Sequence, residues 1–363
     1  MRVSPLNVHS VMAAIETHAL RKVYPAPPAP KRRRRAGASG APAGQGGPSF
    51  GANGGSASQV GAAGNPRGEI VALKALDLEI RDGEFFGLLG PNGAGKTTTI
   101  GILTTRVRPT SGKALIGGAD VATQAVQVRQ RIGVVPQRPN PDRSLNVIEN
   151  LLFHAAYFGI PTSKSRPRAL ALLEQLGIAD KASAKVDEMS GGQQQRLMIA
   201  RALIHEPQVI FLDEPTVGLD PQTRLALWDI LRELHAERRT IVMTTHYMDE
   251  ADKLCDRIAI VDRGELLELD TPAALKERAP GGTMIEIALS GDAVQLDPIR
   301  AEPGVLRAES AGSVLRVYSD RGGRVISPVI QLVEDQGLHV ANISLTEPSL
   351  ETLFVARTGR KLD

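Results

Sequence analysis

Apolar and polar positions divide the chain into a body of alternating strands and helices and a tail with a different order of elements. Short apolar runs followed by polar residues, such as Val209–Leu212, predict strands that are buried on both faces. Segments such as Pro221–Ala236 carry apolar residues at helical spacing instead. This helix is expected to pack on the core through Leu225, Trp228, Leu231 and Leu234. Strands that alternate with helices predict an α/β body with a largely parallel, doubly wound sheet.

Two parts of the body depart from this plan. Glu69–Ile80 alternates apolar and polar residues, which is typical of an edge strand in an antiparallel sheet. Residues 138–188 carry helical spacing with breakers, which predicts a helical insertion. Further strands are expected at Ala14–Tyr24, Glu84–Leu89, Lys113–Ile116, Ile132–Pro136, Thr240–Thr244 and Arg257–Val261. Helices are expected from about Lys96 to Arg106 and at Ala125–Gln130, Leu145–Ala156, Pro167–Leu176, Ser190–His205 and Asp249–Cys255.

The tail, residues 281–363, is expected to form a small α+β domain. Its strands are predicted at Met284–Leu289, Val305–Ser310, Val314–Tyr318 and His339–Leu345, and its helices at Ala293–Arg300, Val325–Asp335 and Ser349–Arg357. The order β-α-β-β-α-β is that of a ferredoxin-like domain. The main domain then covers residues 69–280, preceded by a strand region at 1–24.

Residues 25–68 are of low complexity, rich in Gly, Ala and Pro, and are expected to be a disordered insert. They contain six basic residues and no acidic one, so the rest of the chain carries −3 although the whole chain carries +3. A solvated loop is the simpler reading of the basic run Lys31–Arg35, and contact with anionic lipid headgroups is the alternative. Because this one segment sets the basic balance, and because aromatic residues make up only 3% of the chain, no nucleic-acid partner is expected.

Composition also limits where the protein works. Cys255 is the only cysteine, so an internal disulfide is impossible and the cytosol is favoured. Met1–Ala14 lacks the apolar centre of a signal peptide, and no apolar stretch is long enough to span a membrane. Work at a membrane would therefore need a partner.

The segment Gly90–Thr98 reads GPNGAGKTT and fits the phosphate-binding template G-x-x-x-x-G-K-[ST]. Its glycines let backbone N–H groups curl around an anion, and the following helix adds its positive end. Lys96 supplies a charge for the outer phosphates, and the Thr97 hydroxyl can ligate Mg²⁺. A glycine turn that merely precedes Lys-Thr is the alternative reading. The nucleotide-contacting set is Gly90, Pro91, Asn92, Gly93, Ala94, Gly95, Lys96, Thr97 and Thr98.

Three further polar residues follow predicted strands of the same sheet. Asp213 ends an apolar strand, where its carboxylate can hold Mg²⁺. Glu214 comes next and can polarise a water for attack on a γ-phosphate. His246 can donate a hydrogen bond to a γ-phosphate oxygen, although a lone histidine is more often structural. A solvated corner is the alternative for the Asp-Glu pair.

A second anion-binding helix end is predicted at Ser190, Gly191, Gly192 and Gln193, within MSGGQQQR. The chain would then have two helix starts that can bind phosphate but only one phosphate-binding loop. A dimer explains this, if the second end of each chain closes the nucleotide site of the other.

Together these motifs resemble the nucleotide-binding subunit of ATP-binding cassette (ABC) transporters, over about Ala14–Leu275. The resemblance implies a P-loop NTPase fold of ABC type, with a helical subdomain at about 138–188 and an antiparallel β-subdomain. It also implies a Q-loop glutamine at Gln137, a D-loop at Gly218–Asp220, and an adenine-stacking aromatic at Tyr24, although the insert separates Tyr24 from Glu69. Met189 stands where the family's signature motif usually has leucine.

The resemblance implies a homodimer that sandwiches two ATP molecules. Glu214, His246 and Gln137 are the expected catalytic residues, and Thr97, Gln137 and Asp213 the expected Mg²⁺ ligands. Hydrolysis is expected to drive a separate permease that docks near Gln137–Glu149, with this subunit on the cytoplasmic face of the membrane.

The stretch from Met284 to PSLETLFVARTGR, which ends at Arg360, resembles the tail domain of daunorubicin-resistance-type exporters. Those exporters pair with ABC-2 permeases and carry drug, lipid or polysaccharide-like cargo. The alternative is a soluble ABC ATPase that acts on ribosomes or DNA. The single set of motifs and the lack of a long coiled coil between Lys96 and Asp213 disfavour it. The tail disfavours an importer.

Overall fold

The computed structural model describes residues 13–25, 69–291 and 294–360. The chain forms two compact units, Met1–Lys22 with Ala72–Asp363, and Val23–Val71. The described part of the second unit consists only of the ends of strands β1 and β2. The expected insert and its basic run therefore lie almost entirely outside the described residues.

The strands of the body are β1 (Ala13–Pro25), β2 (Glu69–Arg81), β3 (Phe85–Leu89), β4 (Ser111–Ile116), β5 (Ala119–Asp120), β6 (Ile132–Val135), β7 (Val209–Asp213), β8 (Thr240–Thr245), β9 (Arg257–Asp262) and β10 (Glu265–Asp270). Its helices are α1 (Lys96–Leu103), α2 (Ala125–Arg131), α3 (Val147–Tyr157), α4 (Thr162–Gln175), α5 (Gly191–Leu203), α6 (Pro221–Ala236), α7 (Met248–Leu254) and α8 (Pro272–Glu277). The tail contains β11 (Thr283–Leu289), α9 (Leu296–Arg300), β12 (Val305–Ala311), β13 (Val314–Ser319), α10 (Ile326–Glu334), β14 (Val340–Thr346) and α11 (Leu350–Thr358).

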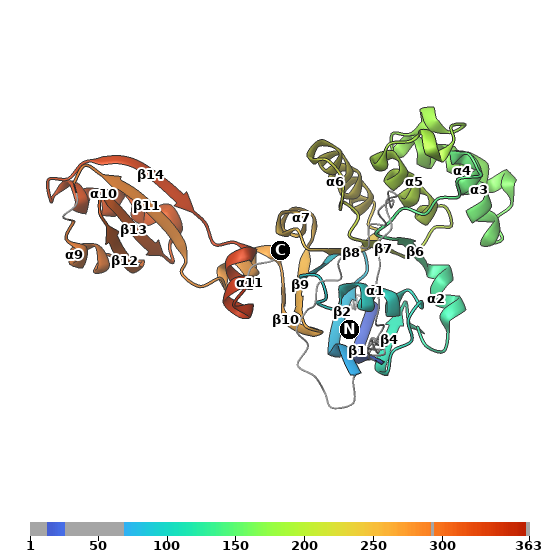
Figure 1. The fold of residues 1–363 in the computed structure, drawn as a ribbon, viewed down its shortest axis with the longest axis horizontal. Coiled ribbons are helices and arrows are strands. Elements are labelled where there is room, and N and C mark those ends of the chain that lie inside the picture. The colour runs from blue at the N-terminus through green and yellow to red at the C-terminus, as the bar shows by residue number, and fades with distance from the viewer. Residues whose placement is uncertain (1–12, 26–68, 292–293, 361–363) are drawn as a thin grey trace, which may run out of the picture. The chain divides into compact units, whose positions relative to one another are not determined.

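The central sheet has the order β10-β9-β3-β8-β7-β6, and its strands β9 to β6 pair in parallel (Figure 1). Every residue of β3, β7 and β8 is buried, as the short apolar runs predict. Because side chains alternate across a strand, Phe85 and Leu89 join one core while Phe86 and Leu88 join another. The sheet therefore separates two apolar cores, and its polar strand ends lie at their common edge.

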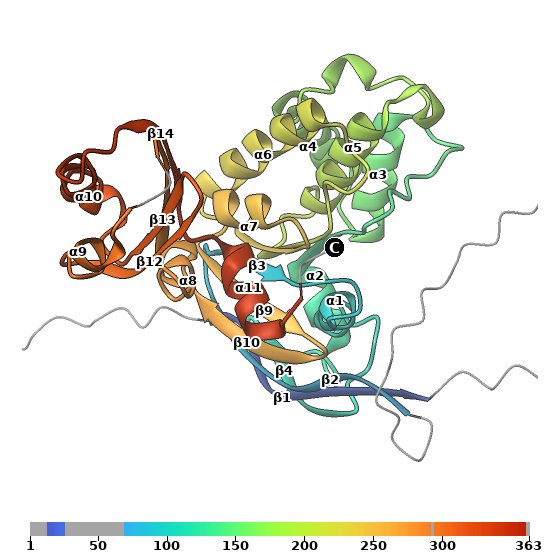
Figure 2. The ribbon, with the colours of Figure 1, turned by 60° about the vertical axis from the view of Figure 1, so that its left-hand side comes forward.

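Each core is completed by different elements. A second, four-stranded sheet in the order β2-β1-β4-β5 packs with α1 and α2 in one core, and β2 lies at its edge as its alternation predicts. Helices α3 to α8 contribute to the other core. In both views α3, α4 and α5 lie side by side (Figures 1 and 2). None of the helices that the structure describes combines the length and apolar character of a membrane span.

The tail sheet has the order β12-β13-β11-β14, and all its neighbours are antiparallel. Ile299 of α9 and Val329 of α10 pack against Ile287 and Val317 of the sheet, so both helices cover the same face (Figure 2). This arrangement confirms the ferredoxin-like plan. The boundary at 281 stays a prediction, and the structure adds that α11 shares its core with the body rather than with this sheet.

Some sequence expectations were wrong in detail. Leu225 is 54% exposed, so the buried face of α6 begins at Leu227. Helix α4 begins at Thr162 and not at Pro167. Pro161 precedes it in extended backbone, and Ser165, in the first turn of the helix, is buried. Pro167 is accommodated inside the helix. Strand β10 and helix α8 had no counterpart in the sequence prediction.

Replacing Phe211 with alanine tests the importance of the buried strands. Phe211 is fully buried at the centre of β7. We expect the substitution to reduce the free energy of unfolding by about 3–5 kcal/mol through lost burial and a residual cavity. Chemical denaturation measures this change. Leu225→Ala is the matched control, because the exposed Leu225 side chain is expected to contribute no more than about 0.5 kcal/mol.

Candidate nucleotide-binding and active site

The phosphate-binding loop runs from the end of β3 to the start of α1. Gly93 and Gly95 have φ angles of 81° and 109°, in the left-handed region that favours glycine. Gly90 is required for a different reason, because a Cβ atom there would lie 2.3 Å from the carbonyl oxygen of Val261. Among the residues that the structure describes, no side chain caps the first N–H groups of α1. These groups are therefore available to an anion.

Lys96 is buried at the first position of α1. Its Nζ donates to the carbonyl oxygens of Gly90 at 2.6 Å and Pro91 at 3.2 Å, and lies 3.1 Å from Oε1 of Glu214. Burial lowers the pKa of Lys96, and the opposite charges of Glu214 and Asp213 partly offset this effect. The side chain is thus held at the loop by three oxygen partners.

Glu214 is the point where the predicted catalytic residues meet. Its Oε2 accepts a hydrogen bond of 2.9 Å from Nε2 of Gln137, and its Oε1 lies 3.5 Å from Nδ1 of His246. With Lys96, these residues follow β6, β7, β8 and β3, so four strand ends bring them together. The carboxyl ends of parallel strands are where open α/β sheets bind ligands. The four side chains form a single constellation around one carboxylate.

The backbone of Glu214 is strained. Its φ of 48° is uncommon for a residue with a side chain. The conformation is held because its N–H donates to Thr244, to the carbonyl oxygen at 3.1 Å and to Oγ1 at 3.0 Å. As a result the side chains of Asp213 and Glu214, although adjacent in sequence, have different partners: Asp213 accepts from Thr244, and Glu214 meets Lys96 and Gln137. Strain retained in this way is common at functional sites.

The three predicted Mg²⁺ ligands line one cavity of about 370 Å³. Thr97, Gln137 and Asp213 are joined there by Gly101, Arg106, Val107, Pro136 and Arg138. Hydroxyl, amide and carboxylate oxygens suit a hard cation such as Mg²⁺. Among the described residues no group of three or more His, Cys, Asp or Glu side chains could hold a metal ion. A cation here would therefore rely on these mixed oxygens together with those of a phosphate.

Thr244 contacts both Asp213 and Glu214, and the sequence prediction missed it. Its Oγ1 donates to Oδ1 of Asp213 at 2.7 Å, in addition to accepting from Glu214. Burial raises the pKa of Asp213, and the Thr244 hydrogen bond opposes that rise. The available signal was the pair of threonines that follows the apolar run Ile241–Met243 in strand Thr240–Thr245. Arg106 and Arg138 beside the cavity were missed as well.

Ser190 and Gln193 are arranged as a capping box at the start of α5. Gln193 N–H donates to Ser190 Oγ at 3.3 Å, and Ser190 N–H donates to Gln193 Oε1 at 3.0 Å. A Cβ at Gly192 would lie 2.3 Å from Cγ2 of Thr223, whereas Gly191 has open space. Ser190 and Gly191 are exposed and bond to none of the residues gathered around Glu214. Within one chain the two predicted anion sites therefore remain separate.

The other predicted site residues occupy ordinary positions in their elements. Asn92 and Thr97 are exposed, so the loop faces solvent, while Ala94 is buried. Asp220 of the expected D-loop caps α6 by accepting from Thr223 N–H at 2.9 Å. Tyr24 lies near the end of β1, in the second compact unit, and its role stays a prediction.

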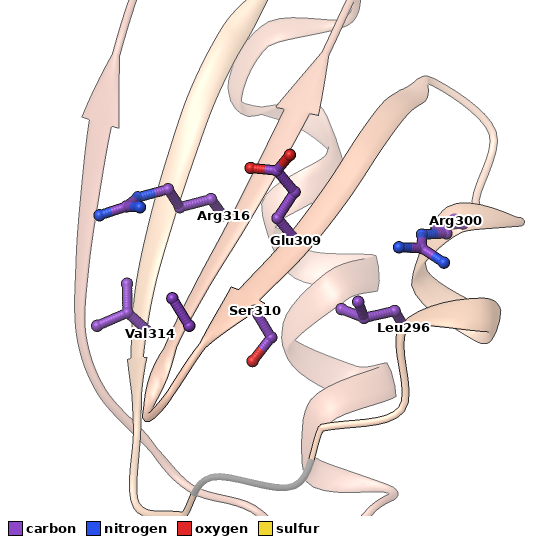
Figure 3. A pocket seen from close by; sticks show the side chains of 7 residues that line it. Leu296, Arg300, Glu309, Ser310, Val314 and Arg316 are labelled. Atoms are coloured by element: carbon purple, nitrogen blue, oxygen red, sulfur yellow. The ribbon is translucent and has the colours of Figure 1, made fainter.

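A separate cavity lies in the tail, between α9 and strands β12 and β13 (Figure 3). Its charged lining is already engaged, because Arg300 donates to the Ala308 carbonyl oxygen at 3.1 Å and Arg316 to Glu286 at 2.8 Å. The lining consists of Leu296, Arg300, Glu309, Ser310, Ala311, Val314 and Arg316. None of the predicted nucleotide-binding or catalytic residues lies there.

Comparison with known proteins decides the family. The sequence model described as "ABC transporter" matches residues 73–217. The Nod factor export ATP-binding protein I of Rhizobium sp. (strain N33) is 40% identical over 296 residues, which covers 82% of this chain and 95% of that protein. This chain belongs to the ABC transporter family. The doxorubicin resistance ATP-binding protein DrrA of Mycobacterium tuberculosis (strain H37Rv) is also 40% identical, over 80% of this ABC protein and 90% of its own length.

Solved structures agree with this assignment. A dimeric, post-hydrolysis ATP-binding cassette with bound ADP and phosphate matches with a TM-score of 0.55 and 26% identity, over 71% of this chain and 98% of that one. The fold is also that of cbiO1 from Clostridium perfringens, with a TM-score of 0.57 and 24% identity, over 73% and 91% of the two chains. The protein is an ABC-type ATPase that binds and hydrolyses ATP. A ribosome- or DNA-acting cassette is not favoured.

Thr244→Val tests the carboxylate positioning. The variant removes the donor to Asp213 while keeping the side-chain shape. We expect ATP hydrolysis to fall about 10- to 100-fold, since a hydrogen bond to a charged group contributes about 1.5–3 kcal/mol and each 1.4 kcal/mol is about tenfold in rate. Steady-state ATPase rates over a range of Mg²⁺ concentrations should also show a higher requirement for the metal. Thr244→Ser keeps the hydroxyl and should behave like the unmodified protein; equal loss in both variants would contradict this role.

Proposed function

We propose that this ABC ATPase drives export through a separate integral-membrane permease of the ABC-2 type. Relatives that match most of its length are named for Nod factor export and doxorubicin resistance. The ferredoxin-like tail supports the same group of exporters. The cargo class that follows is drug, lipid or polysaccharide-like. The subunit would then work at the cytoplasmic face of the membrane, attached through the permease.

The observation that carries the proposed chemistry is the convergence of Lys96, Gln137 and His246 on the Glu214 carboxylate. A carboxylate in this position can accept a proton from a water that attacks the γ-phosphate. Glu214 is therefore the proposed general base. His246 and Gln137 would orient the phosphate and the water. The loop amides and Lys96 would bind the phosphates, and Tyr24 would stack on the adenine.

In this proposal, phosphate binding activates Glu214 as a base because Lys96 exchanges the Glu214 carboxylate for a phosphate. Lys96 Nζ lies 3.1 Å from the Glu214 carboxylate, and both side chains are buried. A phosphate that binds Lys96 would take over this charge and free Glu214 to accept a proton. The base would thus become active only in a chain whose loop holds the outer phosphates of ATP.

Mg²⁺ would be held by Thr97, Asp213 and Gln137 at the cavity beside the loop. The metal would neutralise charge on the phosphate oxygens. Thr244 holds Asp213 in place, and Asp213 in turn would determine where the cation sits. Arg106 lies at the same cavity and lowers the pKa of Asp213 through its charge, against the effect of burial.

A homodimer completes the proposed site. Ser190, Gly191, Gly192 and Gln193 stand at the start of α5, where Ser190 and Gly191 are exposed and Gly192 and Gln193 are half-buried. In a head-to-tail dimer they would contact the γ-phosphate bound to the other chain. A dimeric relative with ADP and phosphate supports this arrangement. ATP would close the dimer, and hydrolysis would reopen it and move the permease.

Glu214→Gln tests the general base and the dimer together. The amide keeps the shape but cannot accept the proton, so hydrolysis should fall about 10²- to 10⁴-fold. ATP should remain bound and hold the protein as a dimer in size-exclusion chromatography. Full turnover by this variant would refute the role of Glu214.

The double variant Ser190→Arg with Glu214→Gln is the matched control for the dimer. Its loop is unchanged, so it should bind ATP, but the arginine should block closure by the second chain. It should therefore elute as a monomer with ATP. A stable dimer in the double variant would mean that Ser190 does not close the site of the partner.

Association with a permease tests the export proposal directly. Affinity-tagged protein from solubilised native membranes should retain a hydrophobic membrane protein, identified by mass spectrometry, and that complex should hydrolyse ATP. Recovery of ribosomal proteins or DNA in its place would favour the alternative class of cassette ATPase.

A further inference from the structure

The phosphate loop rests on the turn between β9 and β10. Gly264 N–H of this turn donates to the carbonyl oxygen of Ala94 in the loop at 2.8 Å. Val261 lies just before the turn, and its carbonyl oxygen lies so close to Gly90 that a side chain there could not fit. Arg263 and Gly264 both have positive φ, of 47° and 76°, so the turn has little freedom to adapt. The position of the loop therefore depends on the position of this turn.

Asp262 begins the turn and is held from the far end of the chain. It is 8% exposed, and Arg360 Nη2 donates to its Oδ1. Arg263 Nε lies at 3.9 Å on the other carboxylate oxygen, a longer and more exposed contact. A buried carboxylate needs a close partner, because an uncompensated charge in the interior is costly. Arg360 therefore supplies the main compensation for Asp262.

Arg360 follows α11 after the single residue Gly359, and α11 is packed against the body. Leu353 and Phe354 are buried in the core that α7 and α8 share, and α11 contacts both helices (Figures 1 and 2). One turn earlier than Arg360, Arg357 pairs with Glu268 of β10. The helix thus lies along the β9–β10 hairpin and binds it at two acidic residues.

We propose that Arg360 is a positioning residue for nucleotide binding, acting through Asp262 and the β9–β10 turn on the phosphate loop. The tail of the chain then contributes to the ATP site although no residue of α11 touches the loop in the contacts described. Conversely, movement of α11 would change nucleotide affinity. This inference rests on the proposed phosphate role of the loop and adds a route by which the tail can influence it.

The test measures ADP binding by titration calorimetry, because ADP binding to one chain does not require dimer closure. Arg360→Ala should raise the Kd for ADP about five- to tenfold, the size of effect known for residues that act through a chain of contacts. In ATPase assays KM should rise with little change in kcat. Arg360→Lys, which keeps a charge able to reach Asp262, should recover most of the affinity.

Arg357→Ala is the matched control, since it removes an ion pair of the same helix away from the turn. Glu268 keeps Arg278 as a partner at 3.1 Å, so the Kd should stay within about twofold. Asp262→Asn removes the charge of the other partner in the Asp262–Arg360 ion pair, and should raise the Kd for ADP as much as Arg360→Ala does. It serves as the test if Arg360→Ala does not fold. An unchanged Kd in the folded variants, or an equal rise in Arg357→Ala, would overturn the proposal. Failure of the unmodified protein to bind ADP would instead refute the proposed nucleotide site.

Discussion

The buried contact between Lys96 and Glu214 is the interaction on which the site depends. The two charges come from separate strand ends, and each is a compensating partner for the other in an interior that excludes water. Burial acts against the charge of Lys96, so the lysine must have oxygen partners to remain charged. The loop carbonyls and Glu214 provide them. A bound phosphate would bring more negative charge to Lys96 than the Glu214 carboxylate does. Binding of the nucleotide would therefore also release Glu214 from Lys96.

This arrangement requires rigid supports, and they are mostly backbone. Gly90 of the loop lies too close to Val261 for a side chain, Gly264 N–H donates to the Ala94 carbonyl oxygen, and the Glu214 turn is held by the carbonyl and hydroxyl oxygens of Thr244. Parallel pairing of β7 with β8 sets Asp213 opposite Thr244 in register. A shift of one residue would reverse the facing of every side chain on the strand. The apolar strands therefore fix the catalytic geometry as well as the two cores.

Much of this was readable from the sequence because the relevant signals are local. Gly90 to Thr97 has a spacing that few other folds require, and Val209–Leu212 and Ile241–Met243 are uninterrupted apolar runs. Boundaries were less predictable where packing overrides local preference, as at Pro167 and Leu225. Thr244 was missed because a threonine in a strand is ordinary until its partner across the sheet is known. Strand β10 was missed because its sequence, ELLELD, does not alternate, and its acidic residues Glu268 and Asp270 pair with arginines only in the folded chain.

The least local feature is the final helix. Nothing in Leu350–Thr358 indicates which core it joins, since an apolar face would suit the tail sheet as well as the body. Arg357, in this segment, and Arg360, just after it, favour the body over the tail sheet. They pair with Glu268 and Asp262, two largely buried acidic residues of one hairpin. Burial of Leu350, Leu353 and Phe354 places the helix in the core of the body, and the two ion pairs fix its contact with the hairpin. A tail that folds as its own ferredoxin-like sheet is in this way tied to the strand pair that supports the phosphate loop.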